Sequence, residues 1–209
     1  MINNSNNIKQ KSKLREYTEA IVYALILAMI LRSFVIQAFK IPSGSMIPTL
    51  LIGDHILVNK FIYGISFPFI DKKFLVFRNP QRGDVIVFKY PEDPSRDFIK
   101  RVIAKEGDTV EVKNKMLYLN GSPQNEKYIQ HTESDLMDKG LGPRDIFGPV
   151  TVPKDKLFVM GDNRDHSLDS RFWGFVDLTQ VRGEAIIKYW SWDSDNTSVR
   201  FNRIGRLIE

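Results

Sequence analysis

DVIVFKY at residues 84–90 and DFIKRVIAK at residues 97–105 are two runs rich in β-branched and aromatic residues. A turn-forming tripeptide borders each of them: Arg82-Gly83-Asp84 at the start of the first, and Glu106-Gly107-Asp108 after the second. Short runs of this composition between turn signals are typical of β-strands. We therefore predict strands at Asp84–Tyr90 and Phe98–Lys105.

The same pattern recurs along most of the chain after residue 40. A hairpin is predicted where Lys113-Asn114-Lys115 joins Thr109–Val112 to Met116–Leu119. No long amphipathic helix alternates with the strands, so we expect a mostly β, antiparallel fold rather than an α/β fold. Residues 121–152 are rich in Gly, Pro and polar residues, and we expect 107–152 to form an irregular insert or flap. The other predicted strands are Ile56–Lys60, Phe74–Phe77, Lys156–Met160, Glu184–Trp190 and Val199–Leu207.

The composition is that of a globular protein. Of the 209 residues, 43% are apolar and 26% charged, which excludes disorder and fibrous repeats and allows a core without disulfides. The absence of cysteine excludes disulfides, thiolate metal sites and a cysteine nucleophile. The three histidines, His55, His131 and His166, are far apart and form no His-x-x-x-His pair. We therefore expect neither a metal site nor a cofactor.

Basic residues are concentrated at the N-terminus. Lys9, Lys11, Lys13 and Arg15 give residues 1–15 a charge of +4, and the rest of the chain has 26 basic and 25 acidic residues. A nucleic-acid-binding protein usually carries its basic residues on the folded domain. We therefore expect no nucleic-acid partner.

An apolar segment follows these basic residues. Residues 20–31 are all apolar, as are 17 of the 20 residues at 20–39. Twenty helical residues span roughly the 30 Å hydrocarbon core of a bilayer. We predict one transmembrane helix at 20–39, a cytoplasmic basic head at 1–19 and an exported domain at 40–209, because positive residues favour the cytoplasmic side. A buried core helix and a cleavable signal peptide are the alternatives, although residues 32–40 offer no small-residue cleavage site.

The first candidate site is Ile41-Pro42-Ser43-Gly44-Ser45-Met46-Ile47-Pro48-Thr49-Leu50. Two prolines restrict the backbone on either side of a glycine and two hydroxyls. This predicts a stiff loop that can present Ser45 and bring backbone N–H groups close to a ligand. On composition alone, an ordinary linker would have the same appearance.

The second candidate site is Asp97-Phe98-Ile99-Lys100-Arg101-Val102-Ile103. In a strand, Phe98 and Lys100 share one face while Ile99 and Arg101 share the other, so whichever face is buried takes a cation with it. Burial among apolar groups disfavours the ammonium form of a lysine, and a neutral amine can accept a proton from a serine. A strand lysine that reaches solvent is the ordinary alternative.

The third candidate site is residues 160–174, Met-Gly-Asp-Asn-Arg-Asp-His-Ser-Leu-Asp-Ser-Arg-Phe-Trp-Gly. Taken alone, it could be a polar turn satisfied by its own ion pairs, such as Asp169 with Arg171. His166 lies beside Ser167, but sequence neighbours rarely form a Ser-His-Asp triad, because that geometry needs groups from separate elements. We do not expect a histidine-based triad.

Taken in order, these motifs resemble the sequence boxes of bacterial type I signal peptidases. The family implies a mostly β catalytic domain with a Ser/Lys dyad that removes signal peptides from exported preproteins at the membrane surface. Only one anchor helix is visible where some members have two, and 107–152 is shorter than the insert of larger members. The resemblance covers the anchor and nearly all of 38–106 and 156–207, and it rests on Ser43-Gly44-Ser45-Met46-x-Pro48-Thr49-Leu50, Gly53-Asp54, residues 82–88, Lys100-Arg101 and residues 161–171.

The resemblance implies a role for each matching residue. Ser45 is the expected nucleophile, Lys100 its general base, and Ser167 the hydroxyl that orients the lysine amine. The Ser43 hydroxyl and the Ser45 backbone N–H are expected to form the oxyanion hole. The expected scaffold residues are Arg101, Asp162, Asp169 and Arg171 as ion pairs and Gly161 as a close backbone approach.

The resemblance also implies how substrate binds. A substrate strand that ends in small residues, of the Ala-x-Ala type, is expected to dock beside strands of the domain. Tyr189, Trp190 and Trp192 suit an aromatic belt against the bilayer, with sheet packing an equal alternative for Trp190. The pocket walls for the −1 and −3 side chains, for which core packing is the alternative, are assigned to Phe39, Ile41, Met46, Leu50, Ile56, Val87, Phe98 and Ile99.

Two other functions fit parts of the pattern. A self-cleaving Ser/Lys regulator of the SOS-repressor type is thought to share the catalytic fold, but such proteins have no export anchor and usually carry a DNA-binding head. A catalytically silent, membrane-tethered β adaptor would have no reason to retain both Ser45 and Lys100. We therefore expect a membrane-anchored serine endopeptidase of the bacterial inner membrane, with secretory preproteins and the lipid bilayer as its partners.

Overall fold

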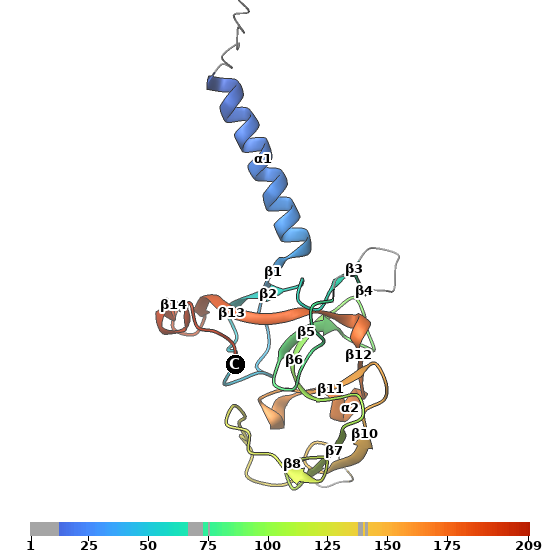
Figure 1. Ribbon diagram of the computed structural model, residues 1–209. Coiled ribbons are helices and arrows are strands. Elements are labelled where there is room, and N and C mark those ends of the chain that lie inside the picture. Colours follow the sequence, from blue (N-terminus) through green and yellow to red (C-terminus); the bar gives the residue numbers. More distant parts are fainter. Residues whose placement is uncertain (1–12, 67–72, 75, 138–139, 141) are drawn as a thin grey trace, which may run out of the picture.

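The computed structural model describes residues 13–66, 73–74, 76–137, 140 and 142–209. Helix α1 (Lys13–Phe34) projects from a body built of antiparallel strands (Figure 1). The prediction of a mostly β, antiparallel fold is confirmed. Residues 1–12, which include Lys9 and Lys11 of the predicted basic head, lie outside the described residues.

The largest sheet has the strand order β1-β2-β13-β5-β6-β11-β12, with β14 paired to β13. Neighbouring strands in this order are antiparallel. Its strands are β1 (Ile36–Lys40), β2 (Asp54–Asn59), β5 (Val85–Lys89), β6 (Asp97–Lys105), β11 (Lys156–Met160), β12 (Val176–Asp177), β13 (Val181–Asp193) and β14 (Ser198–Val199).

A second sheet has the order β10-β7-β8-β9, and a short hairpin pairs β3 with β4. These strands are β7 (Thr109–Lys113), β8 (Met116–Leu119), β9 (Ser122–Pro123), β10 (Phe147–Thr151), β3 (Ile65–Ser66) and β4 (Lys73–Phe74). The short helices are η2 (Arg164–His166), α2 (Ser170–Trp173), η3 (Leu178–Gln180) and η4 (Phe201–Arg203).

Strand β5 is buried on both faces and divides the core of the large sheet. Val85 and Val87 pack into one apolar cluster, whereas Ile86 and Phe88 pack into another. Successive side chains of a strand point to opposite faces, so a continuous apolar run is needed to fill both clusters. Val-Ile-Val-Phe supplies that run, which is why this segment lies at the centre of the fold.

The segment 107–152, expected to form an irregular insert or flap, contains strands as well as irregular stretches. The predicted hairpin of β7 and β8 is confirmed, and β10 joins it to make a sheet whose Val110, Val112 and Leu119 pack in one core cluster with Phe158 and Met160 of β11. No strand was predicted at β10, because glycine and proline at 148 and 149 usually break strands. The two residues are tolerated here because the register shifts between Phe147 and Val150, as is usual for proline at a bulge.

Most of the other predicted strands are confirmed. β8 and β11 have the predicted bounds, and β2, β5, β6 and β7 differ by one or two residues. The strand predicted at Phe74–Phe77 corresponds to β4, which ends at Phe74; residue 75 lies outside the described residues. β13 is longer at both ends than the predicted Glu184–Trp190.

The prediction of one strand at Val199–Leu207 was wrong. The strand β14 ends at Val199, and η4 follows it. In η4, Arg203 bonds the fully buried carboxylate of Asp54, with an Nη2 to Oδ2 distance of 2.6 Å. The positive φ of Gly205 (78°) also breaks the extended conformation. These local contacts outweigh the alternating pattern.

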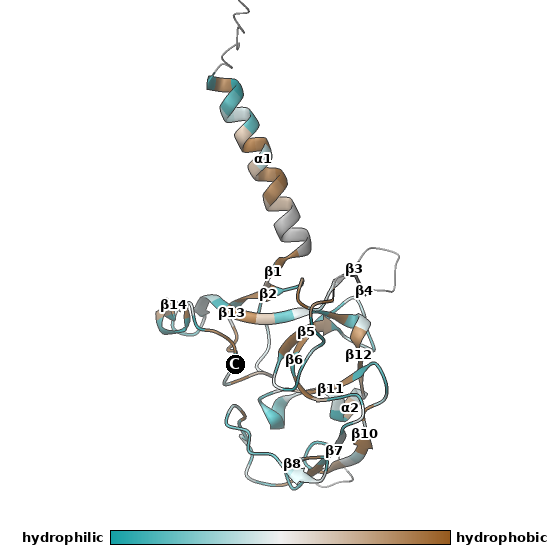
Figure 2. Cartoon of the chain, viewed as in Figure 1, coloured by the Kyte–Doolittle hydropathy of each residue, from teal (hydrophilic) through white to brown (hydrophobic). Residues whose placement is uncertain are grey.

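The predicted helix at 20–39 is divided in the structure. α1 ends at Phe34, and Ile36 begins β1 opposite Asn59 of β2. β-Branched residues at 35 and 36 favour this change to extended backbone. Apolar side chains of α1 such as Ile21, Leu25 and Met29 are exposed, and Figure 2 shows hydrophobic residues along the middle of the helix. No helix among the described residues is long and apolar enough to cross a bilayer.

Candidate active site

The first candidate motif forms the loop between β1 and β2. Two backbone bonds close its base: Ile41 N–H donates to the Asp54 carbonyl (2.8 Å), and Gly53 N–H donates to the Ile41 carbonyl (3.0 Å). Met46 and Leu50 are fully buried in the core cluster beneath it. The loop is therefore fixed at its base and along its apolar side, and it holds Ser45 in place.

Ser45 meets Lys100 of β6 across 55 residues of sequence. The Lys100 Nζ to Ser45 Oγ distance is 2.7 Å, and Nζ also donates to the Ile99 carbonyl at 3.0 Å. Lys100 is only 4% exposed and Ser45 9%. The Phe98 ring centroid lies 5.4 Å from Nζ. The Ser45 hydroxyl and the Lys100 amine are thus in direct contact and largely shielded from solvent.

The surroundings of Lys100 make its amine easier to deprotonate. Burial lowers the pKa of Lys100 from 10.5 to about 8, although the carboxylates of Asp169 and Asp162 act in the opposite direction. A large part of the population is therefore neutral in mildly alkaline solution, and a neutral amine can accept the Ser45 proton.

A cleft of about 540 Å³ opens beside this pair. The cleft is lined by the loop between β1 and β2 that carries Ser45, the expected nucleophile (the nucleophile loop), by the start of β6 and by the segment after β11. The cleft lies where an extended peptide could reach the Ser45 hydroxyl. Its lining residues are Pro42, Ser43, Gly44, Ser45, Arg96, Asp97, Phe98, Ile99, Lys100, Asn163, His166 and Leu168.

The eight predicted wall residues divide into two groups. Phe98 and Ile99 line the cleft. The other group belongs to one core cluster: Phe39, like Ile99, packs against it, and its buried members include Ile41, Met46, Leu50, Ile56 and Val87. The prediction therefore located the apolar floor under the nucleophile loop more than the cleft wall itself.

Ser43 and Ser167 differ in their exposure to the cleft. Ser43 is exposed on the cleft, whereas Ser167 is buried in the segment after η2. A Cβ atom on Gly161 would lie 2.3 Å from Ser167 Oγ and 2.4 Å from the Ser45 carbonyl oxygen. Only glycine fits there. Among the described residues, Ser167 is not a hydrogen-bond partner of Lys100, so the expected direct contact between them is not formed in this structure.

A buried ion pair joins β6 to the third motif. Arg101 Nε and Nη2 donate to the two carboxylate oxygens of Asp162 at 2.9 and 2.7 Å. The Arg101 and Asp162 side chains are 1% and 0% exposed. Thr49 of the nucleophile loop donates to the same carboxylate at 2.5 Å. The ring of Tyr128 stacks on the guanidinium at 4.0 Å. Thr49 and Tyr128 were not predicted from the sequence.

A second buried pair lies within the third motif. Arg171 Nε and Nη2 both donate to Asp169 at 2.9 Å, and the N–H of Gly161 donates to the same carboxylate at 3.0 Å. Burial raises the pKa of Asp169, but its bonds with Arg171 and Gly161 outweigh that effect, and the pKa is lowered. The segment from Gly161 to Arg171 is thereby held as one rigid turn beneath Ser45 and Lys100.

We expect Asp162→Asn to lower the free energy of unfolding by about 3–5 kcal/mol, because it leaves the charge of Arg101 buried without its partner. Urea denaturation of the full chain measures this. Lys156→Gln removes an exposed ion pair of similar distance, Lys156 with Asp177 at 3.1 Å, and is the matched control with an expected loss below about 1 kcal/mol. Equal losses in the two variants would contradict the scaffold role.

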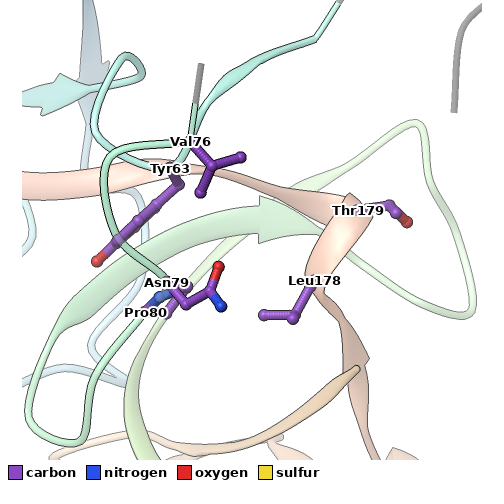
Figure 3. A pocket seen from close by; sticks show the side chains of 6 residues that line it. All are labelled: Tyr63, Val76, Asn79, Pro80, Leu178 and Thr179. Atoms are coloured by element: carbon purple, nitrogen blue, oxygen red, sulfur yellow. The ribbon is translucent and has the colours of Figure 1, made fainter. Parts of the chain in front are cut away.

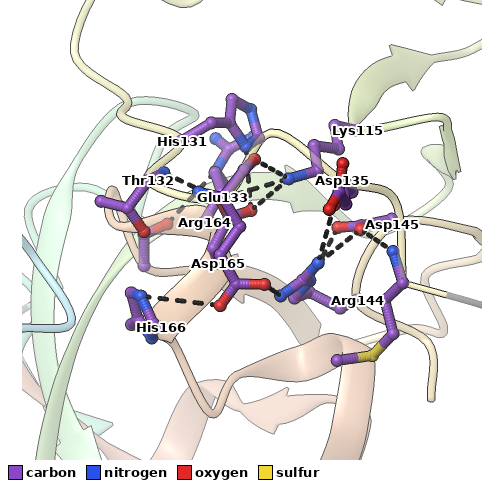
Figure 4. Close-up of polar contacts among 12 residues, drawn as sticks. Lys115, His131, Thr132, Glu133, Asp135, Arg144, Asp145, Arg164, Asp165 and His166 are labelled. Carbon is purple, nitrogen blue, oxygen red and sulfur yellow. Dashed lines mark hydrogen bonds and ion pairs between the residues drawn. The ribbon is translucent and has the colours of Figure 1, made fainter. Parts of the chain in front are cut away.

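A polar network that the sequence did not reveal ties the third motif to residues 131–135 and 144–145 (Figure 4). Asp165 is its centre: its carboxylate accepts from the backbone N–H of Thr132 (2.8 Å) and Glu133 (2.9 Å) and from Lys115 Nζ (3.2 Å). Burial raises the pKa of Asp165, but these bonds outweigh it and lower the pKa. These partners of Asp165 are 30 to 50 residues away in the sequence, within the expected insert 107–152. Short-range sequence patterns therefore did not indicate these contacts.

The Ser45 hydroxyl is paired with Lys100, whereas His131 and His166 contact acidic side chains. His131 Nδ1 lies 3.1 Å from Asp165, and His166 Nε2 lies 3.8 Å from Glu133. His166 lines the cleft, but it is more than half exposed. Its ion-pair contact turns it toward Glu133 (Figure 4), which is consistent with the sequence argument against a histidine triad.

A second, smaller pocket of about 170 Å³ lies between the loop before β5 and η3 (Figure 3). Its lining residues are Tyr63, Val76, Asn79, Pro80, Leu178 and Thr179. The Tyr63 hydroxyl already donates to Asp84 at 2.6 Å. The pocket therefore offers no group poised for chemistry comparable with Ser45 and Lys100.

Comparison with known families assigns the chain to a protein family. The family model described as "Signal peptidase, peptidase S26" matches residues 14–190, which is most of the chain. The chain belongs to the signal peptidase family. It is therefore a serine endopeptidase, a hydrolase that processes preproteins with signal peptides.

Two curated signal peptidases are similar over nearly the whole chain, and a solved structure is similar over about half of it. "Signal peptidase I" of Pseudomonas fluorescens is 38% identical, covering 96% of this chain and 81% of the relative. That of Leptolyngbya laminosa is 37% identical, covering 95% and 86%. The crystal structure of a signal peptidase I from Enterococcus faecalis V583 is 34% identical over 51% of this chain and 97% of that chain, with a TM-score of 0.42.

Proposed function

We propose that this signal peptidase cleaves its substrate with Ser45 as nucleophile and Lys100 as general base. The observation that carries the proposal is the 2.7 Å contact between Lys100 Nζ and Ser45 Oγ in a buried position beside a cleft. The lowered pKa of Lys100 supports it, because the reaction needs a neutral amine to take the hydroxyl proton. Membership in the signal peptidase family supports it independently.

In the proposed reaction, Ser45 Oγ attacks the scissile carbonyl carbon while its proton moves to Lys100 Nζ. The tetrahedral oxyanion is stabilised by the Ser45 backbone N–H and the Ser43 hydroxyl. As the C–N bond breaks, the Lys100 ammonium returns the proton to the leaving amine, and an acyl-enzyme ester on Ser45 remains. The neutral amine then takes a proton from a water molecule that attacks the ester carbonyl carbon. As the ester C–O bond breaks, the Lys100 ammonium returns this proton to Ser45 Oγ, which restores Ser45 and the neutral amine and releases the product as a carboxylic acid that ionises in solution. Buried Ser167, packed against Gly161 near the Ser45 carbonyl, is the proposed second hydroxyl for orienting the amine.

The cleft supports a preference for small side chains next to the scissile bond. Its walls near Ser45 are formed by Phe98 and Ile99 on one side and by the nucleophile loop on the other. The stack of Phe98 on Tyr90, with ring centroids 4.3 Å apart, restricts the movement of that wall. We propose that an Ala-x-Ala segment binds in extended form between the two walls.

We further propose that the enzyme works at a membrane surface. The exposed apolar side chains of α1 support this, as do the partly exposed aromatic residues Tyr189 and Trp190 of β13. A single-pass anchor with a cytoplasmic N-terminus, which places the domain on the exported side of a bacterial inner membrane, is part of the same proposal.

Peptides that differ only at the −1 residue test the substrate proposal. We expect kcat/KM to fall at least tenfold when alanine at −1 is replaced by leucine, because the larger side chain must displace Phe98 or Ile99 from packed positions. A leucine placed at −2 instead is the matched control and should be tolerated, since alternate side chains of an extended peptide face different sides. Equal turnover of the −1 alanine and −1 leucine peptides would contradict the proposed pocket.

A further inference from the structure

We propose that Asn163 is a positioning residue for catalysis: it fixes the orientation of the Gly44–Ser45 peptide so that the Ser45 N–H points toward the oxyanion. This inference rests on the proposed function, in which that N–H is an oxyanion donor. Asn163 acts through the peptide and not on substrate. It lies in the third motif, two residues after Gly161 and four before Ser167.

Two hydrogen bonds connect Asn163 to the nucleophile loop. Its side-chain Nδ2 donates to the Gly44 carbonyl at 3.1 Å, and its backbone N–H donates to the Ser45 carbonyl at 3.1 Å. One residue thus holds the carbonyl groups on both sides of the Ser45 Cα atom. Gly161 packs against the same Ser45 carbonyl, so this side of the loop has little room to move.

The planarity of the peptide converts the Nδ2 bond into control of the oxyanion donor. The Gly44 carbonyl and the Ser45 N–H belong to one planar unit, and in a trans peptide they point in opposite directions. Fixing the carbonyl therefore fixes the N–H. Glycine at 44 gives this peptide more conformational freedom than another residue would. The hydrogen bond from Asn163 therefore restricts the peptide more than it would after a residue with a side chain. The N–H of Ile47 also bonds the Gly44 carbonyl, but at a longer distance of 3.2 Å.

Asn163 is itself held rigidly. It forms an isolated β-bridge with Gln130, in which the Gln130 N–H donates to the Asp162 carbonyl (2.9 Å) and the Arg164 N–H donates to the Gln130 carbonyl (3.1 Å). Asp162 and Arg164 are both in buried ion pairs. A residue that must orient another group needs such support, because an error of a fraction of an ångström weakens the interaction.

The amide oxygen of Asn163 indicates that the residue is not there for stability alone. Asn163 is 5% exposed, and within the described part of the chain its Oδ1 has no hydrogen-bond partner. A buried polar atom without a partner costs about 1–3 kcal/mol, and such atoms are found at functional sites. Asn163 also borders the cleft. A purely structural position would be filled better by a side chain without this unpaired oxygen.

The test compares turnover with binding of a transition-state analogue in the full chain. Asn163→Ala removes the donor, and Asn163→Asp keeps the size but places a carboxylate oxygen against the Gly44 carbonyl. Turnover by both variants is measured at the alkaline plateau of activity, where Lys100 is neutral.

A peptide aldehyde, whose adduct with Ser45 carries an oxyanion, serves as the probe of transition-state binding. We expect kcat to fall about 10- to 100-fold, part of the effect of losing one oxyanion donor. The aldehyde should bind more weakly by a similar factor, while KM changes less than about threefold.

The matched control is Leu168→Ala, which trims the same cleft but removes no side-chain hydrogen bond, because leucine has no donor or acceptor in its side chain. This variant should change KM and aldehyde affinity by similar factors.

The positioning role is overturned if the Asn163 variants bind the aldehyde as tightly as the wild type. It is also overturned if their aldehyde affinity falls only by the factor by which KM rises. Asn163→Asp decides the matter if Asn163→Ala does not fold. If the aldehyde binds Ser45→Ala as well as the wild type, the dyad itself is overturned, and not only the role of Asn163.

Discussion

Ser45→Ala and Lys100→Met should each abolish preprotein cleavage while the chain remains folded. A nucleophile and its base act as a unit, so losing either one costs nearly as much as losing both, and we expect a fall in kcat of about 10⁴-fold or more. The 2.7 Å contact between the two side chains is the structural reason for treating them as a unit. Turnover of a purified preprotein, followed by the appearance of the mature form, measures the effect.

Stability provides the control for Lys100→Met. The pKa of Lys100 is depressed in the folded state, to about 8 from 10.5, so the unfolded state binds more protons between these values and stability rises with pH across that window. At pH 7 the folded protein must hold an unfavourable buried ammonium or release its proton. Methionine removes this cost, so Lys100→Met should be at least as resistant to urea at pH 7 as the wild type. Substantial turnover by a folded Ser45→Ala protein would contradict the mechanism, and so would a Lys100→Met protein that is inactive only because it is unfolded.

Ser43→Ala should lower kcat about 10²- to 10³-fold with little change in KM. Removing one oxyanion donor typically has an effect of this size, because the donor is needed when negative charge develops and not in the ground state. Ser43 is exposed on the cleft, two residues before the nucleophile. Steady-state kinetics on a short peptide separate the two constants.

Ser43→Thr keeps the hydroxyl and is the control for Ser43→Ala. It should retain far more activity than the alanine variant. If alanine at this position raises KM and leaves kcat unchanged, Ser43 is a binding residue and the oxyanion must be held in another way.

The sequence predicted the strands that carry the chemistry because each has a strong local signal. Val85–Phe88 is a continuous apolar run, and Lys156–Met160 is bordered by turns, so their packing is encoded within a few residues. The division of α1 from β1 at residues 35–36 was missed because β1 forms only by pairing with β2, and apolar composition alone does not distinguish the two conformations. The same holds for β10, where Gly148-Pro149 signals a break but the register shift accommodates it.

The candidate site shows the same limit. Local patterns indicated Ser45 and Lys100 as candidates, but their roles as nucleophile and base came from the resemblance to a family, and no local pattern shows that the two side chains touch. Thr49, Asn163 and Asp165 contribute to the site only through partners 30 or more residues away, such as Asp162, Gly44 and Thr132. Contacts of that kind depend on how the nucleophile loop, the third motif, and residues 131–135 and 144–145 meet in space, which short-range patterns do not specify.

The pH dependence of kcat/KM on an uncharged peptide tests the central claim most directly. Because the reaction requires neutral Lys100, activity should rise with pH along a limb whose apparent pKa is near 8, the value to which burial lowers this amine. The position of the limb should stay the same in His166→Ala and should shift in Lys100→His. A limb near the free-lysine pKa of about 10.4, or one near the free-histidine pKa of about 6.5 that disappears in His166→Ala, would contradict the Ser45 and Lys100 assignment.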